Sequence, residues 1–445
     1  MKRTHGFSFL CFLESLKPPQ LLTFGFLSYV GVGIALLALP FSQAQPTSVV
    51  DNLFTIVSAI STTGLSTVSV SDSYTAFGEF VIFMLFQLGG LGYMTVTSFI
   101  ILSCQSGISS TRRNLLSLQF SLPQGFWMSQ FVRNVVIYTL ACETLGAIPL
   151  YIEFARAGVP QPLWSAVFHS VSAFATAGFS LNNNSLEGFR DNIAVNAAIG
   201  VLCYLGALGF IVMQDAYYAC RRKSYRITFT SKIIILMTAL VLAFFAPVLV
   251  FCEPEIAHLP WPSRICVAVF QIMSASSTAG FNTIPISTLS AASLTLIIVS
   301  MVIGASPSGT GGGIKTTSLS ALLGTLISTV RGRIRDVTFF KHAIPYHRLM
   351  SAISSVTLYV IILWSGVFLL CLSDRKDYLQ LIFEAASALG TVGLSMGITA
   401  ALSTWGKLII IALMFLGRVG PLTLGLAFFQ TQKTAAVRPL EDLVT

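Results

Sequence analysis

The chain has 445 residues, of which 54% are hydrophobic and only 10% are charged. A soluble protein of this length would carry roughly a quarter charged residues, so the composition excludes a soluble globular domain and indicates a polytopic membrane protein. The net charge of +9 does not point to nucleic acid, because the basic residues cluster in a few loops, as the positive-inside rule expects.

The loops between the apolar segments alternate between basic and acidic. Basic clusters occur at residues 112–113, 221–232 and 331–348, with acidic residues in the loops between them. We place the basic loops and both termini in the cytosol of a multi-pass protein of the cell (inner or plasma) membrane, surrounded by lipid. A cleavable signal peptide is not expected, because Glu14 and Lys17 interrupt the first apolar stretch.

Apolar segments of membrane-spanning length are predicted in four pairs. In chain order the pairs are 20–41 and 78–103, 130–152 and 192–219, 231–252 and 290–330, and 347–372 and 404–430. Between the members of each pair lies a shorter apolar segment of about 13 residues. As a helix it would reach about 20 Å, too short for a hydrocarbon core of about 30 Å. Each short segment is therefore predicted to be a re-entrant half-helix followed by a loop.

The four short segments carry one repeated pattern. Aligned on a glycine, each copy has Phe ten residues earlier, Ser six earlier, Ala five earlier and Thr two earlier. Four unrelated helices that end at glycine would share the glycine but not the other positions. The copies read NLFTIVSAISTTGLS (52–66), AVFHSVSAFATAGFS (166–180), AVFQIMSASSTAGFN (268–282) and LIFEAASALGTVGLS (381–395).

The repeats predict the architecture. Two spans in each repeat return the chain to the same side of the membrane, so all four repeats share one orientation and their loops can converge on one axis. The expected fold is an all-α polytopic membrane protein, with four span–half-helix–loop–span pseudo-repeats around one central pore. The expected repeats are residues 1–104, 105–222, 223–335 and 336–445.

The loops that begin at the repeated Thr, which we call the TxG tetrads, have the chemistry of a cation filter. Glycine permits the dihedral angles that turn consecutive carbonyls inward, and a ring of carbonyls can replace a cation's water shell. No tetrad contains an acidic side chain, which favours a monovalent cation over Ca²⁺ or Mg²⁺ and leaves K⁺ and Na⁺ both open. The tetrads are Thr62, Thr63, Gly64 and Leu65; Thr176, Ala177, Gly178 and Phe179; Thr278, Ala279, Gly280 and Phe281; and Thr391, Val392, Gly393 and Leu394.

The TxG tetrads resemble the filters of the TrkH/KtrB/HKT superfamily of potassium transporters, and the resemblance covers essentially the whole chain. Because the first repeat begins close to the N-terminus, the chain is more similar to the KtrB branch than to TrkH. In the superfamily, glycine at all four filter positions goes with K⁺ selectivity and serine at the first position with a sodium preference. Gly64 therefore implies K⁺ at the filter carbonyls.

The resemblance implies the ion-translocating subunit of a potassium uptake system, a homodimer gated by a cytosolic nucleotide-binding ring of the KtrA type. K⁺ is then the transported ion, Na⁺ stays open as a coupling or activating ion, and no cofactor is expected within this chain. Two alternatives are a sodium-preferring transporter of the same fold and the pore subunit of an ATP-driven potassium pump. An enzyme is not expected, because the spans hold no paired carboxylates, metal cluster or nucleophile beside a base.

Residues 306–317, SPSGTGGGIKTT, interrupt the last span of the third repeat, and we call them the glycine-rich loop. A straight helix over 290–330 would measure about 60 Å, twice the bilayer core, and Pro307 with the glycines predicts the break. A phosphate-binding loop would need glycine directly before the lysine, where this chain has Ile314. A cytosolic turn and an intramembrane gate are the other interpretations, and Lys315 favours the gate because an intramembrane charge is a functional-site candidate.

The resemblance also favours a gate. KtrB-like proteins carry a glycine-rich intramembrane loop in the corresponding helix, thought to act as a gate, with a usual motif similar to GGGTKTTT. Ile314 of this chain departs from a common threonine. An arginine in the last span also has a counterpart in the family. The residues expected to form the gate are Gly309, Gly311, Gly312, Gly313, Lys315 and Arg418.

Two further acids, Glu143 and Glu384, lie within apolar segments. Neither has a visible counterpart in the other repeats. Glu384 lies inside the fourth half-helix, where we expect it to hydrogen-bond the scaffold, because a buried charge needs hydrogen-bond partners.

The charge pattern predicts the orientation of the chain. In a variant without native cysteines, a cysteine placed beside Arg222 should react with a membrane-impermeant maleimide only from the cytosolic side, and one beside Asn183 only from outside. Labelling of right-side-out and inside-out vesicles measures both. The opposite labelling pattern would reverse the orientation of the whole chain.

Overall fold

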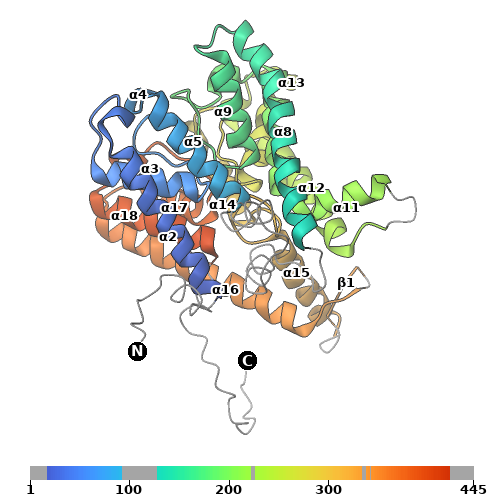
Figure 1. The fold of residues 1–445 in the computed structure, drawn as a ribbon. Coiled ribbons are helices and arrows are strands. Elements are labelled where there is room, and N and C mark those ends of the chain that lie inside the picture. The colour runs from blue at the N-terminus through green and yellow to red at the C-terminus, as the bar shows by residue number, and fades with distance from the viewer. Residues whose placement is uncertain (1–17, 93–127, 222–225, 333–336, 341, 421–445) are drawn as a thin grey trace, which may run out of the picture.

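The computed structural model describes residues 18–92, 128–221, 226–332, 337–340 and 342–420. Within these residues the regular structure is helical apart from one short hairpin (Figure 1). The expectation of an all-α polytopic membrane protein is confirmed. The expected repeat boundaries at residues 104, 222 and 335 lie outside the described residues.

The first two repeats each begin with a long helix, followed by a half-helix that ends at the TxG tetrad. The first repeat contains α2 (Pro18–Leu37), η1 (Pro40–Ser42), α3 (Val49–Ile60), α4 (Val70–Ser73) and α5 (Ala76–Leu91). The second contains α8 (Met128–Arg156), α9 (Pro162–Phe174), η2 (Glu187–Phe189), α10 (Ile193–Ala207) and α11 (Phe210–Arg221). The half-helices are α3 and α9.

The third and fourth repeats follow the same order. The third contains α12 (Phe229–Cys252), η3 (Pro254–Ile256), α13 (Trp261–Ser276), η4 (Ile286–Thr288), α14 (Ala291–Val302) and α15 (Thr316–Val330). The fourth contains α16 (Tyr346–Ser373), α17 (Tyr378–Gly390), η5 (Thr399–Ala401) and α18 (Thr404–Val419). Between them β1 (Thr338–Phe339) pairs antiparallel with β2 (His342–Ala343), with Thr338 opposite Ala343. The half-helices are α13 and α17.

Two predicted spans are broken. In the described chain, α8, α12 and α16 are each long and apolar enough to cross a membrane, and α10 with α11 passes the same test only as a pair bent by 97°. The predicted span over 192–219 is therefore bent, because Gly209 adopts a φ of +87° that an α-helix cannot contain. The expected break in 290–330 is confirmed, since α14 ends at Val302 and α15 begins at Thr316.

The local sequence explains where the half-helices begin and which side they bury. The Ser48 hydroxyl oxygen caps α3 by accepting a hydrogen bond from the Asp51 N–H at 3.1 Å. Helices α9 and α13 carry proline in their first turn, where the missing N–H has no intrahelical partner to lose. The repeated phenylalanine of each half-helix lies in the core: Phe54, Phe168, Phe270 and Phe383 are at most 3% exposed.

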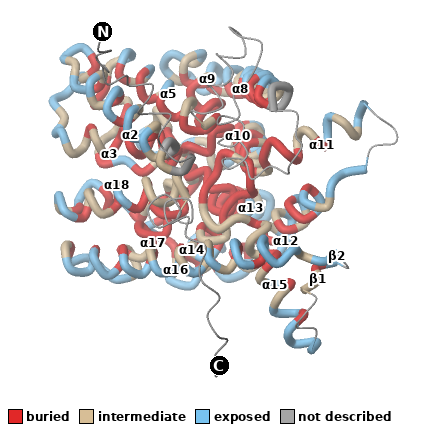
Figure 2. Tube along the Cα trace, turned by 60° about the horizontal axis from the view of Figure 1, so that its bottom comes forward, coloured by how far each residue is buried: buried red, intermediate tan, exposed pale blue. Residues whose placement is uncertain are grey.

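The four repeats close into a ring. Each half-helix packs against the last part of a neighbouring repeat: α9 against α5, α13 against α10, α17 against α14, and α3 against α18. Buried segments gather at the centre, and exposed residues lie on outer helices such as α12 and α16 (Figure 2). Asp51 of α3 and Lys407 of α18 form an ion pair of 2.8 Å, with side chains 16% exposed. This pair joins the first repeat to the fourth, where no covalent connection exists.

The buried repeated phenylalanine predicts a stability difference. Phe383→Ala should lower the free energy of unfolding by about 3–5 kcal/mol, because it leaves a cavity in the core. Phe368 of α16 is 64% exposed, so Phe368→Ala is the matched control and should change stability little. Thermal unfolding in detergent, followed by tryptophan fluorescence, compares the two. Equal midpoints would contradict the packing of α17.

Candidate functional site

Each half-helix ends in the same hydrogen-bonded turn. The N–H of the second tetrad residue donates to the carbonyl of the repeated serine, five residues earlier, at 2.8 Å in all four repeats. The N–H of the first threonine donates to the carbonyl of the repeated alanine at 3.0–3.2 Å. Together these bonds form a Schellman motif, which satisfies carbonyls that the helix end would leave free.

The first threonine of each tetrad has a left-handed backbone. The φ angles of Thr62, Thr176, Thr278 and Thr391 lie between +49° and +57°. This position of a Schellman motif is usually glycine, and a β-branched residue there is strained. Such strain persists only where the surroundings fix it, and it gathers at functional sites. The same strained conformation occurs in all four repeats, which indicates that the threonine side chain has a function there.

The four tetrad glycines lie in a closed ring. A Cβ added to any of them would fall within 2.8 Å of a carbonyl oxygen in the next tetrad, and it would also meet that tetrad's glycine. Gly64 faces Ala177 in this way, and Gly393 of the last repeat faces Thr63 of the first. Their φ angles run from +67° to +97°. No other residue type therefore fits these positions without displacing a neighbouring tetrad. The order of contacts is Gly64, Gly178, Gly280, Gly393 and back to Gly64.

The repeated serine holds the tetrad from behind. The hydroxyl oxygens of Ser58 and Ser387 accept hydrogen bonds from the N–H groups of Gly64 and Gly393 at 3.1 and 3.0 Å. In the second repeat the Ser172 hydroxyl instead donates to the carbonyl of Phe179 at 2.8 Å. The Ser274 hydroxyl of the third repeat has no partner among the described residues. The repeated serine is thus explained in three of the four repeats.

The glycine-rich loop lies directly against the threonine ends of the tetrads. The Thr176 hydroxyl donates to the Thr310 hydroxyl at 3.1 Å, and the Gly312 N–H donates to the Thr278 hydroxyl at 3.1 Å. A Cβ added to Gly312 would collide with the Thr391 hydroxyl. The loop therefore touches three of the four repeats at their threonines.

The loop is also bonded to the break between α10 and α11. The carbonyl of Ala207 accepts from the Ser306 hydroxyl at 2.6 Å, and the carbonyl of Gly206 accepts from the Thr310 N–H at 3.1 Å. Across the break, the N–H of Phe210 donates to the carbonyl of Ser308 at 3.2 Å. Groups that the bent helix leaves without intrahelical partners are thus satisfied by the loop. No local pattern in the sequence predicts this contact, because its two sides lie about a hundred residues apart.

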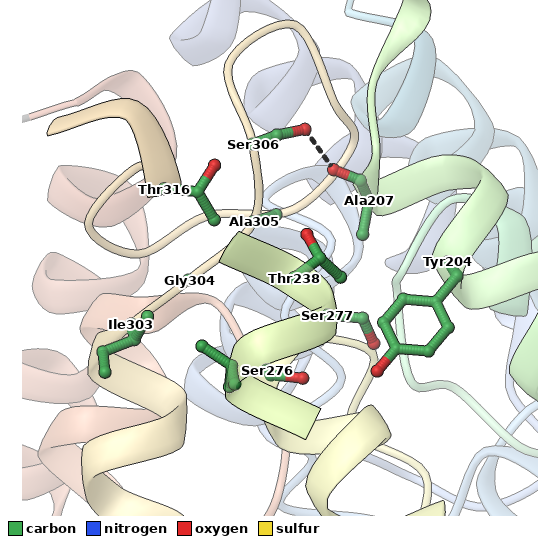
Figure 3. Close-up of a pocket in the computed structure, with 11 residues that line it drawn as sticks. Tyr204, Ala207, Thr238, Ser276, Ser277, Ile303, Gly304, Ala305, Ser306 and Thr316 are labelled. Carbon is green, nitrogen blue, oxygen red and sulfur yellow. Dashed lines mark hydrogen bonds between the residues drawn. The ribbon is translucent and has the colours of Figure 1, made fainter. Parts of the chain in front are cut away.

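A small cavity separates the loop from α12 (Figure 3). It lies between α10, α12, α13 and the residues that follow α14. The Ser306 side chain points across to Ala207 at its edge, as the dashed line in the figure marks. The residues that line it with hydroxyl groups are Tyr204, Thr238, Ser276, Ser277, Ser306 and Thr316.

Two cations hold the carbonyls of the loop. The Lys315 Nζ donates to the carbonyl of Gly311 at 2.7 Å. The Arg418 guanidinium donates to the carbonyls of Thr310 in the loop and Gly89 in α5. Neither cation has a carboxylate partner among the described residues. Gly309 packs against α10, where a Cβ would lie 2.6 Å from the Ala207 carbonyl oxygen, and Gly313 adopts a φ of +70°. The structure thus brings the predicted gate residues together.

Within the described residues, the two buried acids make no hydrogen bond to the tetrad threonines. Glu143 of α8 accepts a hydrogen bond from the Gln87 side chain of α5 at 3.0 Å. Glu384 of α17 accepts hydrogen bonds from the segment that follows the fourth tetrad. The expectation that Glu384 bonds the scaffold is correct.

Apolar spanning helices and four repeats that close on a ring of backbone loops define a polytopic membrane protein with an axis suited to ion passage. The chain belongs to the TrkH family of cation transport proteins, whose sequence model matches residues 32–436.

Comparison with known proteins supports this family. The chain is 33% identical to Ktr system potassium uptake protein B of Bacillus subtilis (strain 168), over 96% of each chain. It is 31% identical to the potassium/sodium uptake protein NtpJ of Enterococcus hirae, over 92% of each. The crystal structure of the potassium transporter TrkH from Vibrio parahaemolyticus matches with a TM-score of 0.72 at 21% identity, over 96% of this chain and 86% of that one.

Proposed function

We propose that this chain is the ion-translocating subunit of a potassium uptake system, with the four TxG tetrads as its selectivity filter. The observation that carries the proposal is the closed ring of Gly64, Gly178, Gly280 and Gly393, each against a carbonyl of the next tetrad. Relatives named as potassium uptake proteins support K⁺ as the transported ion. A transporter is not an enzyme, and no cofactor is proposed within the chain.

The chemistry of the ring suits a monovalent cation. Four half-helices of 12 to 16 residues end at the ring, and their C-terminal ends carry partial negative charge. The hydroxyls of Thr62 and Thr391 are buried without a hydrogen-bond partner among the described residues. Buried polar atoms normally have partners, so a bound cation or its water supplies the missing contact. Backbone carbonyls and hydroxyls without carboxylates favour K⁺ or Na⁺ over divalent ions.

The glycine-rich loop acts in this proposal as the gate. It covers the threonine ends of three tetrads. In this proposal Lys315 lies beside the ion path and bonds the Gly311 carbonyl of the loop. Arg418 of the last span donates to the Thr310 carbonyl of the loop. A positive charge near the axis repels cations, and more strongly where water is excluded. The interpretations as a cytosolic turn or phosphate-binding loop have no support from these contacts.

The proposal extends to partners and location. The name "Ktr system" of the relatives describes a system with more than one component. We propose a cytosolic nucleotide-binding ring of the KtrA type as the partner. We further propose a homodimer in the cell membrane with both termini in the cytosol. The name potassium/sodium uptake protein of one relative keeps Na⁺ as a coupling or activating ion, and makes a sodium-preferring transporter the second candidate.

The filter assignment predicts a selectivity change. Gly64→Ser should lower the preference for K⁺ over Na⁺ by about tenfold, equivalent to about 1.4 kcal/mol, because the new Cβ would lie 2.5 Å from the Ala177 carbonyl oxygen. Gly158→Ser is the matched control, since Gly158 also has a positive φ of +71° but open space around it. K⁺ and Na⁺ uptake into proteoliposomes measures the ratio. An unchanged ratio would remove Gly64 from the filter.

The gate assignment predicts faster flux. Deletion of residues 311–313 should raise K⁺ flux without loss of K⁺ selectivity, because it removes loop contacts to Thr278 and Thr391 but leaves the tetrads intact. Lys315→Ala should also raise flux, and a barrier lower by about 1.4 kcal/mol gives about tenfold. Lys232→Ala, at an exposed lysine in the first turn of α12, is the control. Wild-type flux in the deletion, measured without the cytosolic partner, would sink the gate assignment.

A further inference from the structure

A polar side chain occupies the same buried position in each half-helix, nine residues before the tetrad glycine. The four residues differ chemically, so the sequence pattern alone hides the position. All four side chains are fully buried, at 0% exposure. They are Thr55, His169, Gln271 and Glu384.

In the fourth repeat Glu384 is hydrogen-bonded to the segment that follows the tetrad. Glu384 Oε1 accepts hydrogen bonds from the Ser395 hydroxyl at 2.5 Å and the Met396 N–H at 3.1 Å. Its Oε2 accepts from the Thr399 hydroxyl at 2.9 Å. Ser395 and Met396 are the second and third residues after Gly393. One carboxylate therefore ties three points of the segment that leaves the tetrad.

The second repeat makes the equivalent contact with a different residue. His169 Nδ1 lies 2.7 Å from the carbonyl of Ser165, so it carries the proton, and Nε2 accepts from the Ser180 hydroxyl at 2.9 Å. Ser180 is the second residue after Gly178, as Ser395 is after Gly393. The two serines also make the same local turn, since their hydroxyl oxygens accept from the N–H of Asn182 and Gly397, each at 2.9 Å.

The third repeat uses an amide, and the first repeat differs. Gln271 Oε1 accepts from the Thr283 N–H at 3.1 Å, and Thr283 corresponds to Met396 as the third residue after the glycine. In the first repeat the Thr55 hydroxyl is instead bonded by the Tyr74 hydroxyl at 3.4 Å. Three repeats thus anchor the second or the third residue after the tetrad glycine, or both, to the body of the half-helix.

We propose that His169, Gln271 and Glu384 are specificity-determining positioning residues, which set the K⁺ preference by fixing the chain on the far side of each tetrad. This inference rests on the proposed filter function. In these three repeats the tetrad is fixed before the glycine by the Schellman bonds and after it by this second anchor. With one anchor removed, the glycine carbonyl between them can shift inward, and a ring able to contract also accommodates the smaller Na⁺.

Two substitutions of Glu384 test the anchor: one removes the hydrogen bonds to the outgoing chain, and the other replaces the carboxyl group by an amide. Glu384→Leu should lower the K⁺-over-Na⁺ uptake ratio in proteoliposomes by about fivefold or more, about 1 kcal/mol. Glu384→Gln should restore most of the ratio, because the amide oxygen can still accept from Ser395 and Met396 and the amide nitrogen can donate to the Thr399 hydroxyl oxygen. An unchanged ratio in the leucine variant, or a glutamine variant as defective as leucine, would overturn the proposal.

Two further variants guard against general damage. Ser395→Ala removes one anchor bond from the loop side and leaves the buried acid in place; a smaller loss of ratio is expected, and no loss would count against the anchor. Glu143→Leu removes a buried acid of α8 that bonds Gln87, and its ratio should stay at the wild-type value. An equal loss there would show an unspecific effect and overturn the proposal.

Gly64→Ser in the same assay separates this inference from the proposed function. If Gly64→Ser loses the K⁺ preference while Glu384→Leu keeps it, the filter stands and the anchor fails. If neither variant changes the ratio, the filter assignment itself fails. His169→Gln, which places the residue of the third repeat in the second, should keep the wild-type ratio, and a loss as large as that of Glu384→Leu would contradict an anchor that only needs a hydrogen-bond acceptor.

Discussion

Backbone groups at membrane depth have no water to bond, so every N–H and C=O outside a helix needs a partner within the protein. This chain leaves its helices at the TxG tetrads, at the glycine-rich loop and at the break between α10 and α11. The tetrads satisfy their helix ends within their own repeat. The loop and the break satisfy each other, through the carbonyls of Gly206 and Ala207 and the N–H of Phe210. The need to satisfy these backbone groups therefore explains how the tetrads, the glycine-rich loop and the break between α10 and α11 are arranged.

The same requirement links the loop to distant parts of the chain. Its carbonyls are held by Lys315 within the loop and by Arg418 from the last span, and its hydroxyls and N–H groups reach the second and third repeats. A loop held this way cannot move without new partners for α10, α11 and Arg418.

The repeats are alike in backbone and different in side chains. The bond from the second tetrad residue to the serine carbonyl measures 2.8 Å four times, because the half-helix end fixes it locally. The side chain nine residues before the glycine is threonine, histidine, glutamine or glutamate. In the last three repeats each of these side chains accepts a hydrogen bond from the chain that leaves the tetrad, so the identity of the residue can vary there while the contact stays.

The sequence by itself determined the features that depend on local spacing. The register of Phe, Ser, Ala, Thr and Gly predicted the half-helices and their ends, since a Schellman motif spans only six residues. Pro307 and the following glycines predicted the break before α15, because that segment is too polar and too long to be one span. The tetrads' convergence was expected from the common orientation of the repeats, and the ring of glycine contacts agrees with it.

Only the tertiary structure decided what depends on distant partners. The segment 192–219 is largely apolar, and one glycine in such a segment does not break a span by itself. The bend at Gly209 depends on Ser306 and Ser308, about a hundred residues away. Glu384 had no visible counterpart, because His169 and Gln271 share its hydrogen-bonding role but not its chemistry. Spacing along the chain fixes bonds between near neighbours, whereas a partner that folding brings from another repeat leaves no periodic trace in the sequence.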